Sequence, residues 1–238
     1  MTTDHLVGLK LTNINNYLTI HNNLSPYYSL VHEKPMSTER NPEHTRTRIL
    51  EAAQEEIYEN GYQGMRIEAI LQKTQLAKGA LYHYFPNKLA LGYAVVDEIL
   101  FEQVKVNWSE FSSKYPNPLT AIQQLFLWKA DLYKNEVCFK GCPLNNLNQE
   151  MASIDKGFHE RLEHIMETIY ESIVTALEQG QQQGLARKDI NPRKIAMFII
   201  ASYQGVIGVA KCMQAPQLLT DLFGTLNEYI DTLRTTNH

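Results

Sequence analysis

Apolar residues recur every three or four positions through most of the chain from residue 45 onward, which is the spacing of one face of an α-helix. In the first such segment, Ile49, Ala53 and Ile57 follow one another at four-residue intervals, and Asn60–Gly61 supplies a stop signal. The same reasoning predicts further helices over residues 66–73, 88–111, 119–133, 145–151, 155–183, 193–213 and 216–233, with one short helix within 77–85. The sequence therefore predicts an all-α protein.

The segment from Ala77 to Lys88 carries the most specific chemistry in the chain. Leu76, Leu81 and Phe85 can share the buried side of a short helix. Its other sides then carry a cation, two small residues that let the backbone approach a ligand, and aromatic rings with polar tips: Lys78, Gly79, Ala80, Tyr82 and His83. With the helix at 66–73 and a turn at Thr74–Gln75, this pattern predicts a helix-turn-helix whose second helix enters a DNA groove.

Several motifs in register resemble the DNA-binding domain of TetR-family transcriptional regulators. They are Arg-Ile-Leu-Glu-Ala-Ala from Arg48, Gly61-Tyr62, Ile67 with Ile70, and the run from Lys78 to Lys88. The resemblance implies a three-helix DNA-binding domain at residues 43–91, followed by a helical ligand-binding and dimerisation domain at 92–238. It also implies a ligand- or electrophile-responsive regulator, most often a repressor, that binds a palindromic operator as a homodimer.

The resemblance assigns roles to matching positions. Lys78, Gly79, Ala80, Tyr82 and His83 take the positions at which the family touches bases and backbone. Tyr84 and Lys88 match positions that usually hold phosphates. Arg66 matches the start of the second helix, where the helix amides favour an anion.

Some positions depart from the family pattern or allow another role. Gln75 stands where a turn glycine is usual, and hydroxyl residues are replaced at Met65, Ala77 and Ala80. These departures leave the operator sequence open. Tyr82 and Tyr84 can instead pack in the core, His83 can be an idle surface residue, and Lys88 can simply start the next helix beside its Asn87 cap.

The charge distribution favours binding at specific sites. The net charge is -4, which argues against a protein that coats nucleic acid generally. Between Arg66 and Lys88, however, four basic residues face a single acid, Glu68, whereas several glutamates lie on the preceding helix. A small basic footprint on an acidic body is typical of a sequence-specific DNA-binding protein.

Composition limits the other classes of protein. The three cysteines, Cys138, Cys142 and Cys212, are too few for a disulfide framework and lack a zinc-binding spacing, so neither a metal nor a cofactor is expected. No stretch approaches the ~20 apolar residues of a membrane span, and the first 35 residues lack a secretory signal. The expected location is the cytoplasm.

Residues 1–42 do not share the helical pattern. This stretch is rich in Asn, Thr and Tyr, and Pro26 and Pro35 interrupt it. We interpret it as a flexible N-terminal extension, or as sequence upstream of a natural start at Met36. A DNA-binding arm would need more cations than Lys10 alone before residue 34.

Cys142 is the most interesting residue of the C-terminal part. The run Gly141–Leu147 with Glu150 resembles a segment that borders the ligand cavity in one branch of the family, where a cysteine can sense oxidants or electrophiles. The alternative is a small, buried, packed thiol, since the only cation beside it in sequence is Lys140. Cys138 is a candidate resolving partner.

Aromatic residues are the other candidates for an effector site. Together with Cys142, the candidate residues are Trp108, Tyr133, Met151 and Tyr170. They can line a cavity or fill a solid core. The absence of clustered charge favours a neutral or weakly polar effector, or a reactive electrophile.

The helices at 155–183 and 193–213 resemble the pair that forms the family's four-helix dimer interface. Ala201, Gly205 and Gly208 form a strip of small residues that permits close helix approach. The alternative is that both helices pack within one subunit.

Two other classes of protein fit the sequence less well. An enzyme would need Cys142 as nucleophile with His159 or His164 as base, but no oxyanion loop, phosphate loop or metal motif accompanies them. A purely structural helical scaffold would leave the groove-facing set at Lys78–Ala80 without a purpose.

Overall fold

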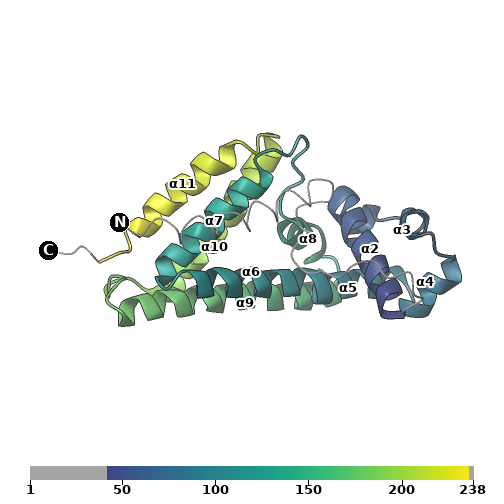
Figure 1. Cartoon of the computed structure of the whole chain (residues 1–238), viewed down its shortest axis with the longest axis horizontal. Coiled ribbons are helices and arrows are strands. Elements are labelled where there is room, and N and C mark those ends of the chain that lie inside the picture. Colours follow the sequence, from purple (N-terminus) through teal and green to yellow (C-terminus); the bar gives the residue numbers. More distant parts are fainter. Residues whose placement is uncertain (1–41, 236–238) are drawn as a thin grey trace, which may run out of the picture. The chain divides into compact units, whose positions relative to one another are not determined.

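The computed structural model describes residues 42–235, and over this range the chain is a set of helices joined by short connections (Figure 1). In the described residues, the pairing typical of strands is confined to one isolated bridge, between Ala186 and Arg234. The predicted all-α fold is confirmed. The predicted extension at 1–42 lies outside the described residues apart from Pro42, at which the first described helix begins.

Three helices make up the part that contains the predicted helix-turn-helix: α2 (Pro42–Gly64), α3 (Ile67–Thr74) and α4 (Lys78–Tyr84). Their inward residues are buried, and five of them are at most 5% exposed: Ile49, Ala53, Ile57, Ile70 and Leu81. Helix α2 begins earlier than predicted, since proline is tolerated in a first helical turn. Gly61, with φ of 74°, interrupts α2 where Asn60–Gly61 predicted a stop.

The long helix predicted from Lys88 is continuous but changes its winding. It comprises α5 (Lys88–Ala94), the π-helical stretch η1 (Val95–Leu100) and α6 (Phe101–Lys114). The Asn87 side chain caps its start by accepting the Ala90 N–H at 2.8 Å. The apolar spacing predicted one helix but not the wider turn at its centre.

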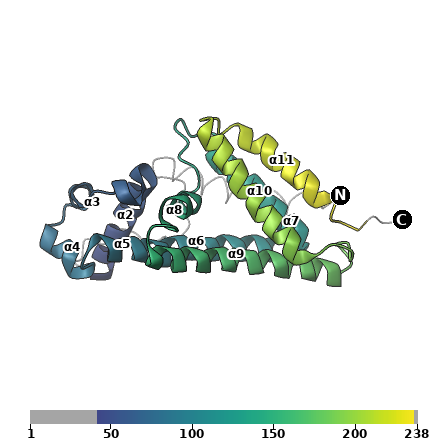
Figure 2. The same cartoon turned by 180° about the vertical axis from the view of Figure 1, so that it is seen from behind.

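The remaining helices are α7 (Pro118–Tyr133), α8 (Pro143–Met151), α9 (Lys156–Gln182), α10 (Pro192–Cys212) and α11 (Leu218–Asp231). Helix α9 runs alongside α6, while α7 packs against α11 and α10 packs against both α9 and α11 (Figures 1 and 2). The rings of Phe126, Tyr203 and Phe223 stack on one another with centroids 5.5 Å apart. Three distant segments are thereby joined in one core.

The length and apolar composition of helix α10 contradict the expectation that no segment approaches a membrane span. By length and composition its 21 residues are apolar enough to cross a membrane, with a mean hydropathy of 1.6 over the best 18-residue window. Ser202 and Gln204 interrupt its apolar residues, so the sequence contains no unbroken apolar run of that length here. Core helices of soluble proteins pass the same test, but only 28% of this window is buried. The exposed apolar surface of α10 therefore needs a separate explanation.

Candidate functional site

The turn between α3 and α4 is held in the geometry of a helix-turn-helix by two local features. Gln75 adopts the left-handed conformation, with φ of 57°, at the position where a glycine would be unstrained. Arg48 of α2 donates a hydrogen bond to the Thr74 carbonyl at 2.7 Å, which satisfies an orphan group at the end of α3. The turn therefore forms without the usual glycine.

Helix α4 separates a buried side from an open one. Leu81 is fully buried and Phe85, just after the helix, is 3% exposed, as predicted, whereas Leu76, before the helix, is only half-buried. Lys78, Gly79, Tyr82 and His83 are exposed, while Ala80 and Tyr84 are half-buried. An added Cβ at Gly79 would meet no atom within 4 Å, so the backbone there is open to close approach.

The aromatic residues of α4 form contacts on that open side rather than in the core. The Lys78 ammonium lies 6.0 Å from the centre of the Tyr82 ring, and the His83 and Tyr84 rings meet edge to face at 5.4 Å. Tyr82 is 36% exposed, which does not favour the packing alternative for that residue.

Arg66 and Lys88 differ in their surroundings. Arg66, directly before α3, keeps its side chain 72% exposed with a long 3.4 Å contact to Glu56. Lys88 donates to the Gln63 carbonyl at 2.9 Å, and its ammonium lies 5.1 Å from the centre of the Tyr62 ring. Lys88 therefore holds the end of α2 as well as starting α5.

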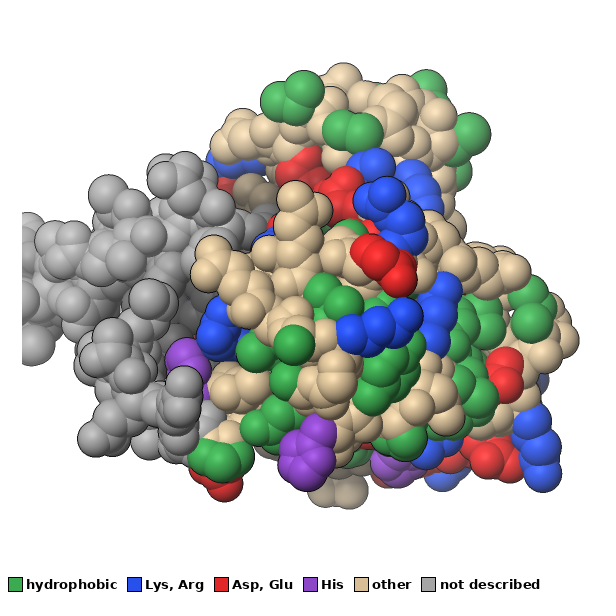
Figure 3. All heavy atoms as spheres, turned by 90° about the vertical axis from the view of Figure 1, so that its right-hand side faces the viewer, with side chains coloured by type: hydrophobic (Ala, Val, Ile, Leu, Met, Phe, Trp, Pro, Cys, Tyr) green, Lys and Arg blue, Asp and Glu red, His purple; other side chains and the backbone are tan. Residues whose placement is uncertain are grey.

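Figure 3 views the molecule from the side of α3 and α4, where several basic side chains are seen among hydrophobic and acidic ones. Exposed Arg66, Lys73, Lys78 and His83 all belong to this part of the chain. Lys73 is paired with Glu55 of α2, and the remaining cations lie along α4 and the start of α3. The predicted DNA-binding residues thus lie directly before α3, along α4 and at the start of α5.

Contacts from α8 and α9 tie this part to the rest of the molecule. Glu150 of α8 accepts backbone hydrogen bonds from Tyr62 and Gln63, and the Tyr62 ring packs on Phe158 of α9 at 4.5 Å. The Tyr93 hydroxyl donates to Asp155 at 2.6 Å, and this hydrogen bond raises the pKa of Tyr93 to about 12. The sequence did not predict that Glu150 accepts these hydrogen bonds, because nothing in the local residue pattern indicates a partner 88 residues away.

Cys142 sits at the start of α8, 8% exposed, among groups that sequence did not place there. Burial raises the pKa of Tyr203 well above its usual value, and the Cys142 thiol, hydrogen-bonded to Tyr203, adds to this effect. Burial lowers the pKa of Lys129, and Cys142 opposes that shift. Lys140, the cation next to Cys142 in sequence, pairs with Glu59 instead. The cation that interacts with Cys142 therefore comes from α7.

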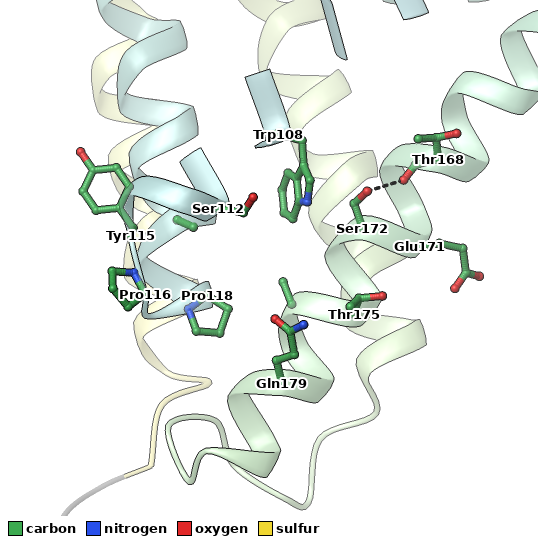
Figure 4. A pocket seen from close by; sticks show the side chains of 12 residues that line it. Trp108, Ser112, Tyr115, Pro116, Pro118, Thr168, Glu171, Ser172, Thr175 and Gln179 are labelled. Carbon is green, nitrogen blue, oxygen red and sulfur yellow. Dashed lines mark hydrogen bonds between the residues drawn. The ribbon is translucent and has the colours of Figure 1, made fainter. Parts of the chain in front are cut away.

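The other effector candidates do not share one site. Tyr133 is fully buried against Phe139 and interacts electrostatically with Cys142. Met151 is buried at the far end of α8, and Tyr170 lies on α9 with the Arg193 guanidinium 5.8 Å from its ring centre. Trp108 instead lines a pocket of about 470 Å³ between α6, α7 and α9 (Figure 4).

Comparisons with known proteins agree with this arrangement. A family described as "Bacterial regulatory proteins, tetR family" matches residues 49–95, and one described as "Tetracyclin repressor-like, C-terminal domain" matches residues 118–225. The chain is similar to the regulator UidR of Escherichia coli K12, with 44% identity over 180 residues that cover 72% of this chain and 83% of UidR. It is also 30% identical over 186 residues to an uncharacterised HTH-type transcriptional regulator of Lactococcus lactis, covering 78% of this chain and 93% of that protein.

A solved structure gives the same result. The chain superposes on a TetR transcriptional regulator from Chloroflexus aurantiacus with a TM-score of 0.72 and 25% identity, over 83% of this chain and 100% of that one. The matched proteins are transcriptional regulators rather than enzymes, as predicted. Sequence motifs, helix arrangement and relatives converge, and the chain belongs to the TetR family of DNA-binding transcriptional regulators.

Proposed function

We propose that the protein is a homodimeric repressor that binds a palindromic operator in the cytoplasm and leaves it when a small molecule or electrophile binds its C-terminal part. The proposal rests on the exposed side of α4. This side carries the cation Lys78, the glycine Gly79, and two aromatic residues with polar groups, Tyr82 and His83. The family description "Tetracyclin repressor-like" supports repression as the mode of action.

On this proposal, α4 enters the major groove. Lys78, Tyr82 and His83 contact base edges or the backbone, and Gly79 with Ala80 lets the helix come close. Arg66 and Tyr84 hold flanking phosphates. Lys88 already binds the Gln63 carbonyl, but an ammonium has further donors for a phosphate.

DNA binding and regulation are assigned to two consecutive sets of helices. We propose a DNA-binding domain at 43–91 and a regulatory and dimerisation domain at 92–238. Helix α5 starts in the first and leads through η1 and α6 into the second, so the long helix mechanically couples the two.

The proposed dimer interface rests on the exposed apolar face of α10. Met197, Phe198 and Val209 are 49–56% exposed on this helix. Ala201 and Gly205 are exposed between them, and an added Cβ at Gly205 or Gly208 would meet no atom within 4 Å. A helix of a second subunit can therefore approach closely. Such a contact would explain why α10 exposes apolar surface although it belongs to no membrane span in this proposal.

The second helix of the interface fits α11 better than α9. The Phe198 ring touches Tyr229 of α11 at 4.9 Å, so the apolar face continues onto α11. The exposed residues of α9 are mostly polar or charged, among them Glu160, Glu163 and Glu167. We therefore propose α10 with α11 as the interface, in place of the pair at 155–183 and 193–213.

Selection of genome fragments by the purified protein, followed by titration of the enriched site, tests the proposal. We expect a pseudo-palindrome with half-sites one helical turn, ~34 Å, or a multiple of it apart, and affinity that falls steeply with salt. Absence of any enriched sequence would contradict the DNA-binding proposal.

A charge placed on the strip of small residues tests the dimer. We expect Gly205→Arg to be monomeric in sedimentation and to lose operator binding, whereas Ser113→Arg, an exposed position on α6, remains dimeric. A dimeric Gly205→Arg variant would refute the proposed interface.

A further inference from the structure

The pocket beside Trp108 has two chemically different walls. The side formed by the end of α6 and the start of α7 is largely apolar, with Tyr115, Pro116 and Pro118. The facing side, from α9, carries Ser172, Thr175 and Gln179. In Figure 4 the Trp108 ring projects into the space between these walls. The volume of about 470 Å³ lies within the range of small-molecule sites.

Three hydroxyl groups of the pocket donate their protons to carbonyls of their own helices. Ser172 Oγ donates to the Thr168 carbonyl at 2.7 Å, and Thr168 Oγ1 donates to the His164 carbonyl at 2.9 Å. Ser112 Oγ, from α6, donates to the Ser109 carbonyl at 3.1 Å. With each proton held by its own helix, the oxygen offers its lone pairs to a ligand. The pocket therefore suits a ligand rich in O–H donors.

Charge plays little part in this lining. Glu171 is the charged member, and its carboxylate is held by Arg193 at 2.9 Å. Figure 4 shows its carboxylate turned away from Trp108. Binding here would rely on hydrogen bonds and on stacking against the indole, rather than on an ion pair.

We propose that this pocket binds a hydroxyl-rich ring compound, a sugar or a glycoside, and that it is the effector site of the repressor. The ring's apolar face stacks on Trp108, and its hydroxyls donate to Ser112, Thr168 and Ser172, while the Gln179 amide offers both a donor and an acceptor. The assignment of this pocket as the effector site rests on the proposed function. Binding of the sugar or glycoside does not, because it does not require DNA.

Fluorescence titration of a Trp128→Phe variant, in which Trp108 is the remaining tryptophan, provides the test. The probes are methyl and phenyl β-glucopyranosides and β-galactopyranosides, with benzyl alcohol as an aromatic probe without a sugar ring. We expect saturable quenching by at least one glycoside. A phenyl glycoside that binds tighter than its methyl counterpart identifies a glycoside ligand, and equal binding identifies the sugar ring alone. Quenching by benzyl alcohol alone, or by none of the probes up to their solubility, overturns the inference.

Two neighbouring serines supply a matched control. Ser112 lines the pocket and Ser113 does not, although both are exposed and both hydroxyls donate to a carbonyl of their own helix. We expect Ser112→Ala and Ser172→Ala to weaken glycoside binding about fivefold, the worth of one hydrogen bond, and Ser113→Ala to leave it unchanged. Equal affinities in all three variants would place the ligand elsewhere.

Operator binding by the same preparations separates the two proposals. A protein that binds its operator but no glycoside retains the proposed function and loses this inference. A protein that binds a glycoside in this pocket but no DNA sequence retains the site and loses the proposed function.

Discussion

The Glu150 carboxylate accepts the backbone N–H of Tyr62 at 2.9 Å, and its second oxygen accepts that of Gln63 at 2.8 Å. These amides lie just after Gly61, where α2 loses its helical conformation. One side chain of α8 thus satisfies two groups exposed by the break in α2. Because Cys142 stands at the other end of the same short helix, a displacement of α8 would reach the DNA-binding helices directly.

Glu150→Ala should lower the free energy of unfolding by about 2 kcal/mol, since two hydrogen bonds to a charged acceptor are lost and the Tyr62 amide is partly buried. Chemical denaturation measures this change. Gln149→Ala, at the exposed neighbouring position, should stay within ~0.5 kcal/mol of the wild type. Equal stability of the two variants would show that the carboxylate contributes nothing.

Gly61→Ala should cost more than Gly184→Ala. Both glycines have positive φ, 74° and 71°, and Gly61 also has a ψ of 166°, which lies outside the left-handed helical region. Alanine is therefore strained by about 1 kcal/mol or more at either position, and this backbone conformation at Gly61 is open essentially to glycine alone. At Gly61 the new Cβ would also lie 2.9 Å from Glu150 Oε2, whereas nothing lies within 4 Å at Gly184. Thermal unfolding of both variants measures this difference, to which the backbone conformation and the contact both contribute, and a smaller loss for Gly61→Ala would contradict the prediction.

Lys78→Ala and Tyr82→Ala should each weaken operator binding about tenfold without loss of stability, since both side chains stand on the open side of α4. Removal of the Lys78 charge should also reduce the salt dependence by about one phosphate contact if that contact is to the backbone. Lys114→Ala, exposed at the end of α6, serves as the control. Unchanged operator affinity in both variants would rule out α4 as the recognition helix.

Cys142→Ser should keep the protein on its operator in the presence of an α,β-unsaturated carbonyl that releases the wild type. The Cys142 side chain is hydrogen-bonded to Tyr203 and interacts with Lys129, so modification of the thiol would disturb contacts between α7, α8 and α10. Cys138→Ser and Cys212→Ser, at exposed cysteines, should be released like the wild type. If all four proteins respond alike, Cys142 is a packed thiol and not a sensor.

Glu136→Gln should flatten the pH dependence of stability between pH 5 and 8. Burial raises the pKa of Glu136 to about 7, while its hydrogen bond from Tyr58 of α2 opposes the rise. Unfolded Glu136 ionises near its ordinary value of 4.5, so the folded protein binds the extra proton and loses stability as pH rises toward 7. Because the group is partly solvated, the loss should be about 1 kcal/mol or less. Thermal melts that run parallel for both proteins across this range would contradict the prediction.

The helices were predictable from sequence because apolar spacing, caps and stops act over a few residues. The spacing around Ile49 and Ile57, the stop at Gly61 and the cap at Asn87 correspond to observed features of α2 and α5. The exposed set on α4 also follows from local spacing, since Leu81 must face inward. Helix boundaries were less accurate, and the π-helical stretch at Val95–Leu100 left no mark in the apolar pattern.

Contacts between distant segments were decided by the tertiary structure alone. In the sequence, Lys140 is the cation next to Cys142. In the folded protein the thiol interacts with Lys129 and Tyr203 instead, and Lys140 forms an ion pair with Glu59. Trp108 was grouped with Tyr133 and Tyr170 on aromatic character, and the packing of α6, α7 and α9 gives it separate neighbours. Spacing along the chain determines which side of a helix a residue occupies, whereas only the packing of the helices determines what that side meets.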